Sequence, residues 1–172
     1  MNKTFGFTLF LGVALLSCAP KANQSTNTLE PAASNAPVLS TGLHQISAGF
    51  QFTCGLTPTG KAYCWGRNEE GQLGNNSTTN SSVPVMVAAP KAEGALNVSS
   101  ISTGAFFACG LTLDRRAYCW GFNKFGQLGN KTTTDSSVPV AVASKDGSVQ
   151  NFSSLEVGGG QACGLKIGRA HV

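Results

Sequence analysis

The sequence predicts an all-β fold built from repeats of short antiparallel strands. One observation is internal repetition: 28 of the 43 residues from Ile46 to Ala88 recur unchanged 55 positions later, and a third copy begins at Leu155. A second is composition, because 12% of the residues are charged while 21 are glycine and 7 are proline. Short strands between glycine- and proline-rich turns are typical of such a composition. Repetition at this period indicates one supersecondary unit per copy, stacked on its neighbours.

The N-terminal residues 1–17 are predicted to be a lipoprotein signal peptide. Lys3 provides the positively charged n-region of a signal peptide. Phe5 to Leu16 is an apolar run of 12 residues, which is too short to span a bilayer as a helix. The run leads into Leu15-Leu16-Ser17-Cys18, which resembles the lipobox of bacterial lipoproteins. Cys18 is therefore the expected lipid attachment site. The alternative is a plain secretory signal followed by an unrelated cysteine.

Residues 18–43 are rich in Ser, Thr, Asn, Ala and Pro, so we expect a flexible tether there. Such a tether would hold the following domain away from a membrane. Together with the signal, it predicts a protein of the bacterial cell envelope that is lipid-anchored at the outer membrane or cell surface, or else periplasmic.

The repeats are predicted to cover residues 44–172, with copies at 46–100, 101–154 and 155–172. In the first copy, strand-like runs at 52–57 and 61–65 flank the turn Pro58-Thr59-Gly60, where Gly60 suits the left-handed position. The second copy places Arg115 at that position, which suits it less well. Further strands are expected at 46–48 and from Ser82 onward. About four short strands per copy is the size of a propeller blade.

A longer motif joins the hairpin to a glycine-rich turn and recurs 55 residues later: Cys54-Gly55-Leu56, Tyr63-Cys64-Trp65-Gly66, Asn68 and Gly71-Gln72-Leu73-Gly74. It resembles the repeat of the regulator of chromosome condensation (RCC1) family. The resemblance implies a β-propeller of four-stranded antiparallel blades, usually seven, of which this chain would hold about two and a third. Because the third copy stops within its hairpin, we expect a truncated reading frame; the alternative is a split propeller that another chain completes.

The cysteines fit this arrangement. Cys54 and Cys64 lie symmetrically about one hairpin turn, and Cys109 and Cys119 about the next, so each pair should face across neighbouring strands. Export to an oxidising compartment favours two disulfides. Metal binding is the less favoured alternative, since the pairs have no histidine nearby. Cys163 would be left free, because Val172 stands at the position of its partner.

Catalysis is not predicted. The two histidines, His44 and His171, have no partner that the sequence would place beside them, and adjacent Glu69 and Glu70 are replaced in the second copy. We therefore predict a non-enzyme without cofactor or metal. The formal charge of +4 is spread without a Lys/Arg cluster, which argues against nucleic acid as a partner.

Comparison of the copies separates scaffold from binding positions. The unchanged residues are those that packing and tight turns need, so Trp65 and Trp120 are expected to pack between blades. The residues that change cluster at turn tips, and loops on a rigid scaffold commonly carry binding. The candidate partner-binding residues are Arg67, Glu69, Glu70, Phe122, Lys124 and Phe125. The sequence thus predicts a protein-binding module, such as an inhibitor or a scaffold; the alternative is part of an exported enzyme acting on polysaccharide.

Overall fold

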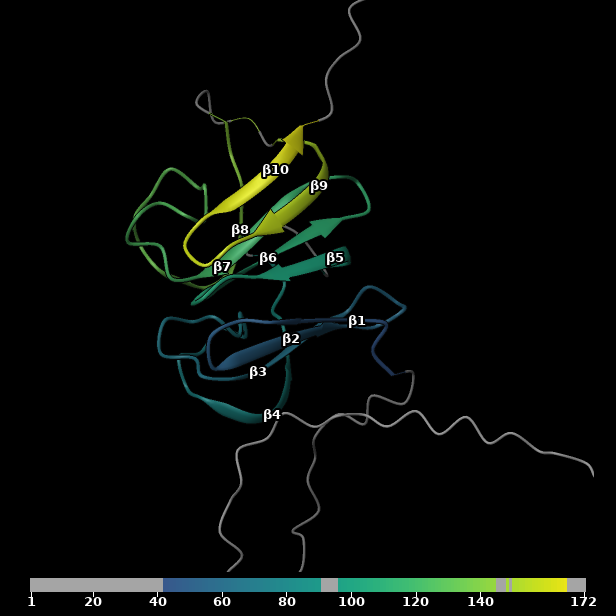
Figure 1. Cartoon of the computed structure of the whole chain (residues 1–172), viewed down its shortest axis with the longest axis vertical. Helices are drawn as coiled ribbons and strands as arrows, with labels where there is room; N and C mark the ends of the chain where they lie inside the picture. The colour runs from purple at the N-terminus through teal and green to yellow at the C-terminus, as the bar shows by residue number, and fades with distance from the viewer. Residues whose placement is uncertain (1–41, 91–95, 145–147, 149, 167–172) are drawn as a thin grey trace, which may run out of the picture. The chain divides into compact units, whose positions relative to one another are not determined.

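The computed structural model describes residues 42–90, 96–144, 148 and 150–166, all within one unit, Asn35–Val172. Over these residues the protein consists of ten strands in three antiparallel sheets (Figure 1). The first sheet has the order β1-β2-β3-β4, the second β5-β6-β7-β8, and the third pairs β9 with β10. The strands are, in chain order, Gln45–Ala48, Phe52–Leu56, Ala62–Gly66, Ser81–Met86, Val98–Thr103, Phe107–Thr112, Ala117–Gly121, Ser136–Ala141, Phe152–Val157 and Ala162–Lys166.

Two complete four-stranded blades and the first hairpin of a third confirm the predicted partial β-propeller. We refer to the three sheets as blades 1, 2 and 3. The predicted signal peptide, Cys18 and nearly all of the tether lie outside the described residues, as do His171 and Val172. Within the described ranges there is no helix that could cross a membrane.

The β2–β3 and β6–β7 hairpins turn as the sequence predicts. In blade 1 the amide of Lys61 donates to Thr57 Oγ1 at 3.1 Å, and Gly60 closes the turn with φ of 80°. In blade 2 Arg115 holds the same left-handed conformation with φ of 68°, which is unfavourable for a residue with a Cβ atom. Contacts with the next blade offset that cost, because the Arg115 carbonyl accepts from the amide of Phe152 at 2.8 Å and its guanidinium donates to the Ser153 carbonyl at 3.1 Å.

Both predicted disulfides are present. The hairpin register sets Cys54 opposite Cys64 and Cys109 opposite Cys119, with 4.1 Å between the Cα atoms of each pair. That separation identifies a non-hydrogen-bonded pair, in which side chains approach most closely. Cys163 is free and exposed, as the sequence indicated.

The blades stack through their apolar faces, each disulfide face against the next blade. Blade 1 contributes Phe52, Leu56 and its disulfide, and blade 2 covers them with Ile101 and Trp120, which are 3% and 0% exposed. The same arrangement between blades 2 and 3 buries Phe107, Leu128 and the second disulfide. Trp120 therefore packs between blades as predicted.

Polar contacts repeat with the same period along the first strand of each sheet. Ser47 Oγ accepts from the amide of Thr103 at 3.0 Å, and Ser102 Oγ accepts from the amide of Val157 at 3.1 Å. The Gln45 side chain also bonds both backbone groups of Ile101. Blades 1 and 2 thus each satisfy backbone groups of the blade that follows.

Candidate partner-binding surface

Four phenylalanines form a continuous row across blades 1 and 2. Phe50 lies in the β1–β2 turn, Phe106 in the β5–β6 turn, and Phe122 and Phe125 in the loop that follows β7. Neighbouring rings meet edge to face, with centroids 5.4 Å apart for Phe50–Phe106, 6.3 Å for Phe106–Phe122 and 6.0 Å for Phe122–Phe125. Such pairs stabilise by about 0.5–1.5 kcal/mol beyond their buried area. We call this row the aromatic ladder.

Backbone hydrogen bonds set the ladder's spacing. The Phe50 amide donates to the Ala105 carbonyl at 3.0 Å, which brings the β1–β2 turn beside the β5–β6 turn. Within blade 2, Phe107 pairs with Gly121, and the Phe122 amide donates to the Phe106 carbonyl at 3.0 Å. The ladder's spacing therefore follows from one backbone hydrogen bond between the blades and from the β6–β7 register within blade 2.

A buried asparagine shapes the loop that carries Phe125. The Asn123 side chain is 0% exposed; its amide group donates to Asn130 Oδ1 and to the carbonyls of Thr132 and Thr134. Its oxygen accepts from the Leu128 amide at 2.9 Å. Asn68 does the same in blade 1, with Asn75, Ser77, Thr79 and Leu73 as partners. This explains why the asparagine is identical in both copies while the tip residues differ.

Arg67 joins the charged residues of blade 1 to the ladder. Its guanidinium carbon lies 5.3 Å from the centre of the Phe106 ring, a cation–π contact. The same guanidinium donates to Glu69 at 2.6 Å and to Glu70 at 3.3 Å. A polar depression of about 650 Å³ adjoins Arg67 and is lined by Gln51, Glu69, Asn80, Ser81 and Ser82.

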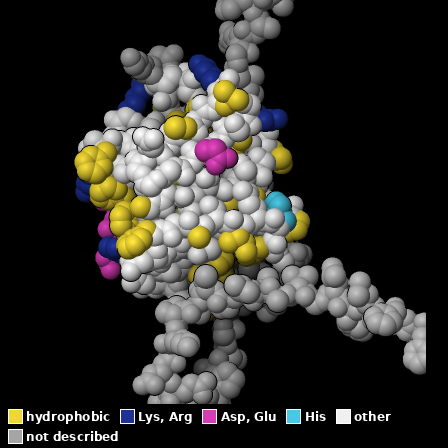
Figure 2. Space-filling model, viewed as in Figure 1, with side chains coloured by type: hydrophobic (Ala, Val, Ile, Leu, Met, Phe, Trp, Pro, Cys, Tyr) yellow, Lys and Arg dark blue, Asp and Glu magenta, His cyan; other side chains and the backbone are white. Residues whose placement is uncertain are grey.

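The outer members of the ladder are exposed. Phe50 is 54% and Phe125 is 85% exposed, whereas Phe106 and Phe122 are partly buried. Figure 2 shows hydrophobic side chains gathered along one edge of the described region, with basic and acidic side chains beside them. Exposed aromatic groups in contact with one another are more typical of an interaction surface than scattered single residues are.

The structure brings five of the six predicted binding residues into this surface. Arg67, Glu69 and Glu70 form one ion-pair group, and Phe122 and Phe125 are in ring contact. Lys124 sits between the two phenylalanines in sequence, but its side chain pairs with Asp135 at 3.3 Å. Phe50 and Phe106 are not among the residues predicted from the sequence. They also stand at turn positions that differ between the copies, where Ala105 and Gln51 are their counterparts.

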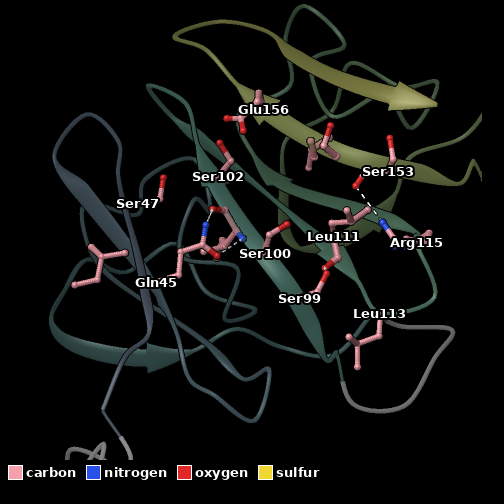
Figure 3. A pocket seen from close by; sticks show the side chains of 14 residues that line it. Gln45, Ser47, Ser99, Ser100, Ser102, Leu111, Leu113, Arg115, Ser153 and Glu156 are labelled. Carbon is pink, nitrogen blue, oxygen red and sulfur yellow. Dashed lines mark hydrogen bonds between the residues drawn. The ribbon is translucent and has the colours of Figure 1, made fainter. Parts of the chain in front are cut away.

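A second candidate site is a depression of about 510 Å³ along β1, β5 and β9, drawn in Figure 3. It is polar and rich in serine: Ser47, Ser99, Ser100, Ser102, Ser153 and Ser154. Most of these hydroxyls already bond within the protein, since those of Ser99 and Ser153 donate to strand carbonyls and those of Ser47 and Ser102 accept from the next blade. They hold the strands and blades together, so we assign the depression a structural role.

The described residues contain no group of three or more His, Cys, Asp or Glu side chains that could hold a metal ion. The acids that adjoin one another in sequence, Glu69 and Glu70, are both bound to Arg67. The geometry of this surface therefore supports binding, through apolar rings with a polar margin.

Comparison with known proteins identifies the blades. The profile described as the regulator of chromosome condensation (RCC1) repeat matches residues 59–111 and 114–165, and a related profile with the same description matches 43–72 and 98–127. These matches cover more than half of the chain, so the protein belongs to the RCC1 repeat family.

Curated relatives share the repeats. The chain is 35% identical over 105 residues to the ultraviolet-B receptor UVR8 of Arabidopsis thaliana, covering 61% of this chain and 23% of that protein. It is 32% identical over 106 residues to the human E3 ubiquitin-protein ligase HERC2, covering 62% of this chain and 2% of the ligase. The chain thus spans a quarter or less of these relatives.

Solved structures agree on the fold. Human WBSCR16 superimposes with a TM-score of 0.62 at 22% identity, over 73% of this chain and 31% of that one. Yeast Prp20p, whose structure was reported with its binding properties to Gsp1p and histones, gives 0.58 at 18% identity, over 75% and 32%.

Proposed function

We propose that this chain is an exported, lipid-anchored RCC1 repeat protein that binds another protein through the aromatic ladder, as an inhibitor or a scaffold. The observation that carries the proposal is the row of four phenylalanines in mutual contact, with Phe125 85% exposed. Aromatic residues anchor protein–protein interfaces because they bury a large apolar area with few rotatable bonds.

The charges beside the ladder favour a protein over a nucleic acid. Arg67 is paired with two glutamates and Lys124 with Asp135, so little positive charge is free to bind phosphate. A relative by fold, yeast Prp20p, is described as binding Gsp1p and histones, which is a precedent for protein binding by such a propeller. The partner of this chain is expected to offer an apolar pocket for Phe125 and hydrogen-bonding groups for the polar depression beside Arg67.

The cell envelope is the proposed location. Its main support is in the sequence: the apolar run that leads into Leu15-Leu16-Ser17-Cys18, and the expected tether to residue 43. Both disulfides are also consistent with an oxidising compartment. Labelling cells with an alkynyl fatty acid should mark the wild-type protein, and Cys18→Ser should abolish the mark. Unmarked, freely soluble wild-type protein would refute the anchor.

The polysaccharide-acting enzyme is not favoured by any observation on the described residues. Such enzymes use two carboxyl groups on either side of the scissile bond. Here Glu69 and Glu70 both bind the same guanidinium nitrogen of Arg67, Nη2.

Site-specific photo-crosslinking tests the binding surface. A photoreactive phenylalanine at position 125 should give an adduct with one envelope protein in the producing cell. The matched control carries it at Leu113, an apolar residue 78% exposed at the opposite end of β6 from Phe106. Adding Phe50→Ser to the position 125 variant should remove the adduct without unfolding the domain. Equal adducts from both positions would contradict a specific role for the ladder.

A further inference from the structure

The polar depression beside Arg67 has the character of a ligand site. Its volume of about 650 Å³ is that of an ordinary ligand pocket. The described residues that line it include no apolar side chain: Gln51, Gly66, Arg67, Glu69, Asn80, Ser81 and Ser82. Such walls offer no complement to the aromatic or aliphatic anchor with which a protein partner fills a pocket. They suit a ligand that carries hydrogen-bonding groups on several sides.

Polar groups of this depression are left without a partner inside the protein. Among the described residues, the side-chain amide of Gln51 and the Nδ2 of Asn80 make no hydrogen bond. Glu69, whose side chain is 61% exposed, uses one carboxylate oxygen to bind Arg67. The depression therefore presents unused amide donors beside an unused carboxylate oxygen.

Gln51 occupies a strained position in the β1–β2 turn. Its φ of 62° lies in the left-handed region, which is unfavourable for a residue with a Cβ atom and free of cost for glycine. Phe106, at the same position in blade 2, does not have a positive φ, so the blade does not require this conformation. Strain that persists in this way is typical of functional positions, and it points to a role for the Gln51 side chain.

Asn80 carries one group more than the loop needs. Its Oδ1 accepts from the Asn68 amide at 2.7 Å. In blade 2 the same bond is made by Asp135, whose Oδ1 accepts from the Asn123 amide at 2.8 Å. The loop thus requires only an acceptor at this position, and the Asn80 amide nitrogen is available to a ligand.

We propose that the depression binds a neutral oligosaccharide. Sugar hydroxyls both donate and accept, so neighbouring hydroxyls pair with planar amides and carboxylates such as those of Gln51, Asn80 and Glu69. The C–H face of a sugar ring is apolar and packs on the exposed ring of Phe50. Phe50 borders the depression, because its ring and the Arg67 guanidinium both contact the Phe106 ring, which is 5.4 Å from the first and 5.3 Å from the second.

The charges of the depression favour a neutral sugar. Arg67, Glu69 and Glu70 form one ion-pair group with two negative charges and one positive charge, so a phosphate, a sulfate or a uronic acid would be repelled. The proposal goes beyond the protein partner of the ladder, because a sugar supplies the hydrogen-bonding groups expected at the depression. The sugar is either a glycan on that partner or a separate polysaccharide.

A saturation-transfer NMR titration tests the site on the full-length protein, in a detergent without a sugar head group. The probes are cellotetraose, maltotetraose, chitotetraose and mannotetraose. At least one should bind saturably, and its fully O-methylated form, which lacks hydroxyl donors, should bind at least about tenfold more weakly. No saturable binding of any probe up to about 10 mM, or equal binding of the O-methylated form or of tetragalacturonate, would overturn the proposal.

Two variants separate sugar binding from folding. Gln51→Gly removes the side-chain amide and relieves the strain, so it should weaken binding at least about fivefold while thermal melting shows equal or higher stability. Asn80→Asp keeps the Oδ1 acceptor, as in blade 2, and should also weaken binding at least about fivefold. The matched controls are Asn76→Gly, another left-handed residue, and Thr78→Asp, the same charge in the same loop; both lie outside the depression. Binding that is unchanged in the two variants, or lost equally in the controls, would overturn the proposal.

The crosslinking experiment at position 125 keeps this test distinct from that of the ladder. An adduct with a protein, formed by a chain that binds none of the tetrasaccharides, would overturn the sugar site and leave the protein partner standing. With a tetrasaccharide that does bind, an excess of it identifies the source of the sugar. Loss of the adduct shows that the partner carries the glycan, and an unchanged adduct shows that the sugar belongs to a separate polysaccharide.

Discussion

Replacing Trp120 should destabilise the protein far more than replacing Trp65, although both occupy the same position in their repeats. Trp120 is 0% exposed between blades 1 and 2, and its Nε1 donates to the Gln72 carbonyl at 3.0 Å. Trp65, at the same position in blade 1, is only partly buried. Comparing the two variants therefore measures how much the blade–blade interface contributes to the free energy of unfolding, because the residue type and the strand position are the same in both.

The expected magnitude for Trp120→Ala is about 4–6 kcal/mol of the free energy of unfolding. Truncating a buried tryptophan costs about 3–5 kcal/mol, and the Gln72 carbonyl left without its donor adds about 1 kcal/mol or more. For Trp65→Ala we expect about 1–2 kcal/mol, since part of its surface is already in water.

Guanidinium denaturation followed by circular dichroism, with the disulfides intact, measures these differences. Since Trp120→Ala removes a large part of an ordinary domain's stability of about 5–15 kcal/mol, Trp120→Phe is the second variant. It keeps most of the apolar contact but loses the hydrogen bond, and should cost about 1–3 kcal/mol. Equal losses for Trp65→Ala and Trp120→Ala would refute the assignment of the tryptophan to blade packing.

The fold could be predicted from the sequence because the copies of the repeat can be aligned with one another. The two copies of the hairpin fix the turn, and the turn fixes the register that sets Cys54 opposite Cys64. Local rules also identified Arg115 as an unfavourable turn residue, which its φ of 68° confirms. What they could not show is how Arg115 is stabilised, because its partners Phe152 and Ser153 belong to the next blade.

The candidate partner-binding surface could be predicted only in part from the sequence. Phe122 and Phe125 are three residues apart in one loop, so their proximity follows from the local sequence. Phe50 meets Phe106 only because the Phe50 amide bonds Ala105 across the blade interface. Contacts between residues some 55 positions apart depend on how two blades dock, and no local pattern encodes that geometry.

Three further predictions test local features of the blades. Arg115→Gly should raise the free energy of unfolding by about 0.5–1 kcal/mol, because relief of the left-handed strain outweighs one exposed hydrogen bond to Ser153; a loss of stability in thermal melting would contradict this. Thiol counting on the denatured, lipidated protein should find Cys163 as the one reactive thiol, and reduction of each disulfide should cost about 2–3 kcal/mol; reactive Cys54 or Cys109 before reduction would show that the bridges do not form in the cell. Asn123→Ala should loosen the loop that carries Phe125, because the amides and carbonyls of residues 128, 132 and 134 lose their buried partner. Its expected cost is about 2–4 kcal/mol, and hydrogen exchange should show faster exchange at Leu128 than in the matched Asn130→Ala variant, because the Leu128 amide donates to Asn123 and not to Asn130. Exchange at Leu128 that is unchanged in Asn123→Ala would mean that the loop, and with it the outer end of the aromatic ladder, is held by contacts other than this asparagine.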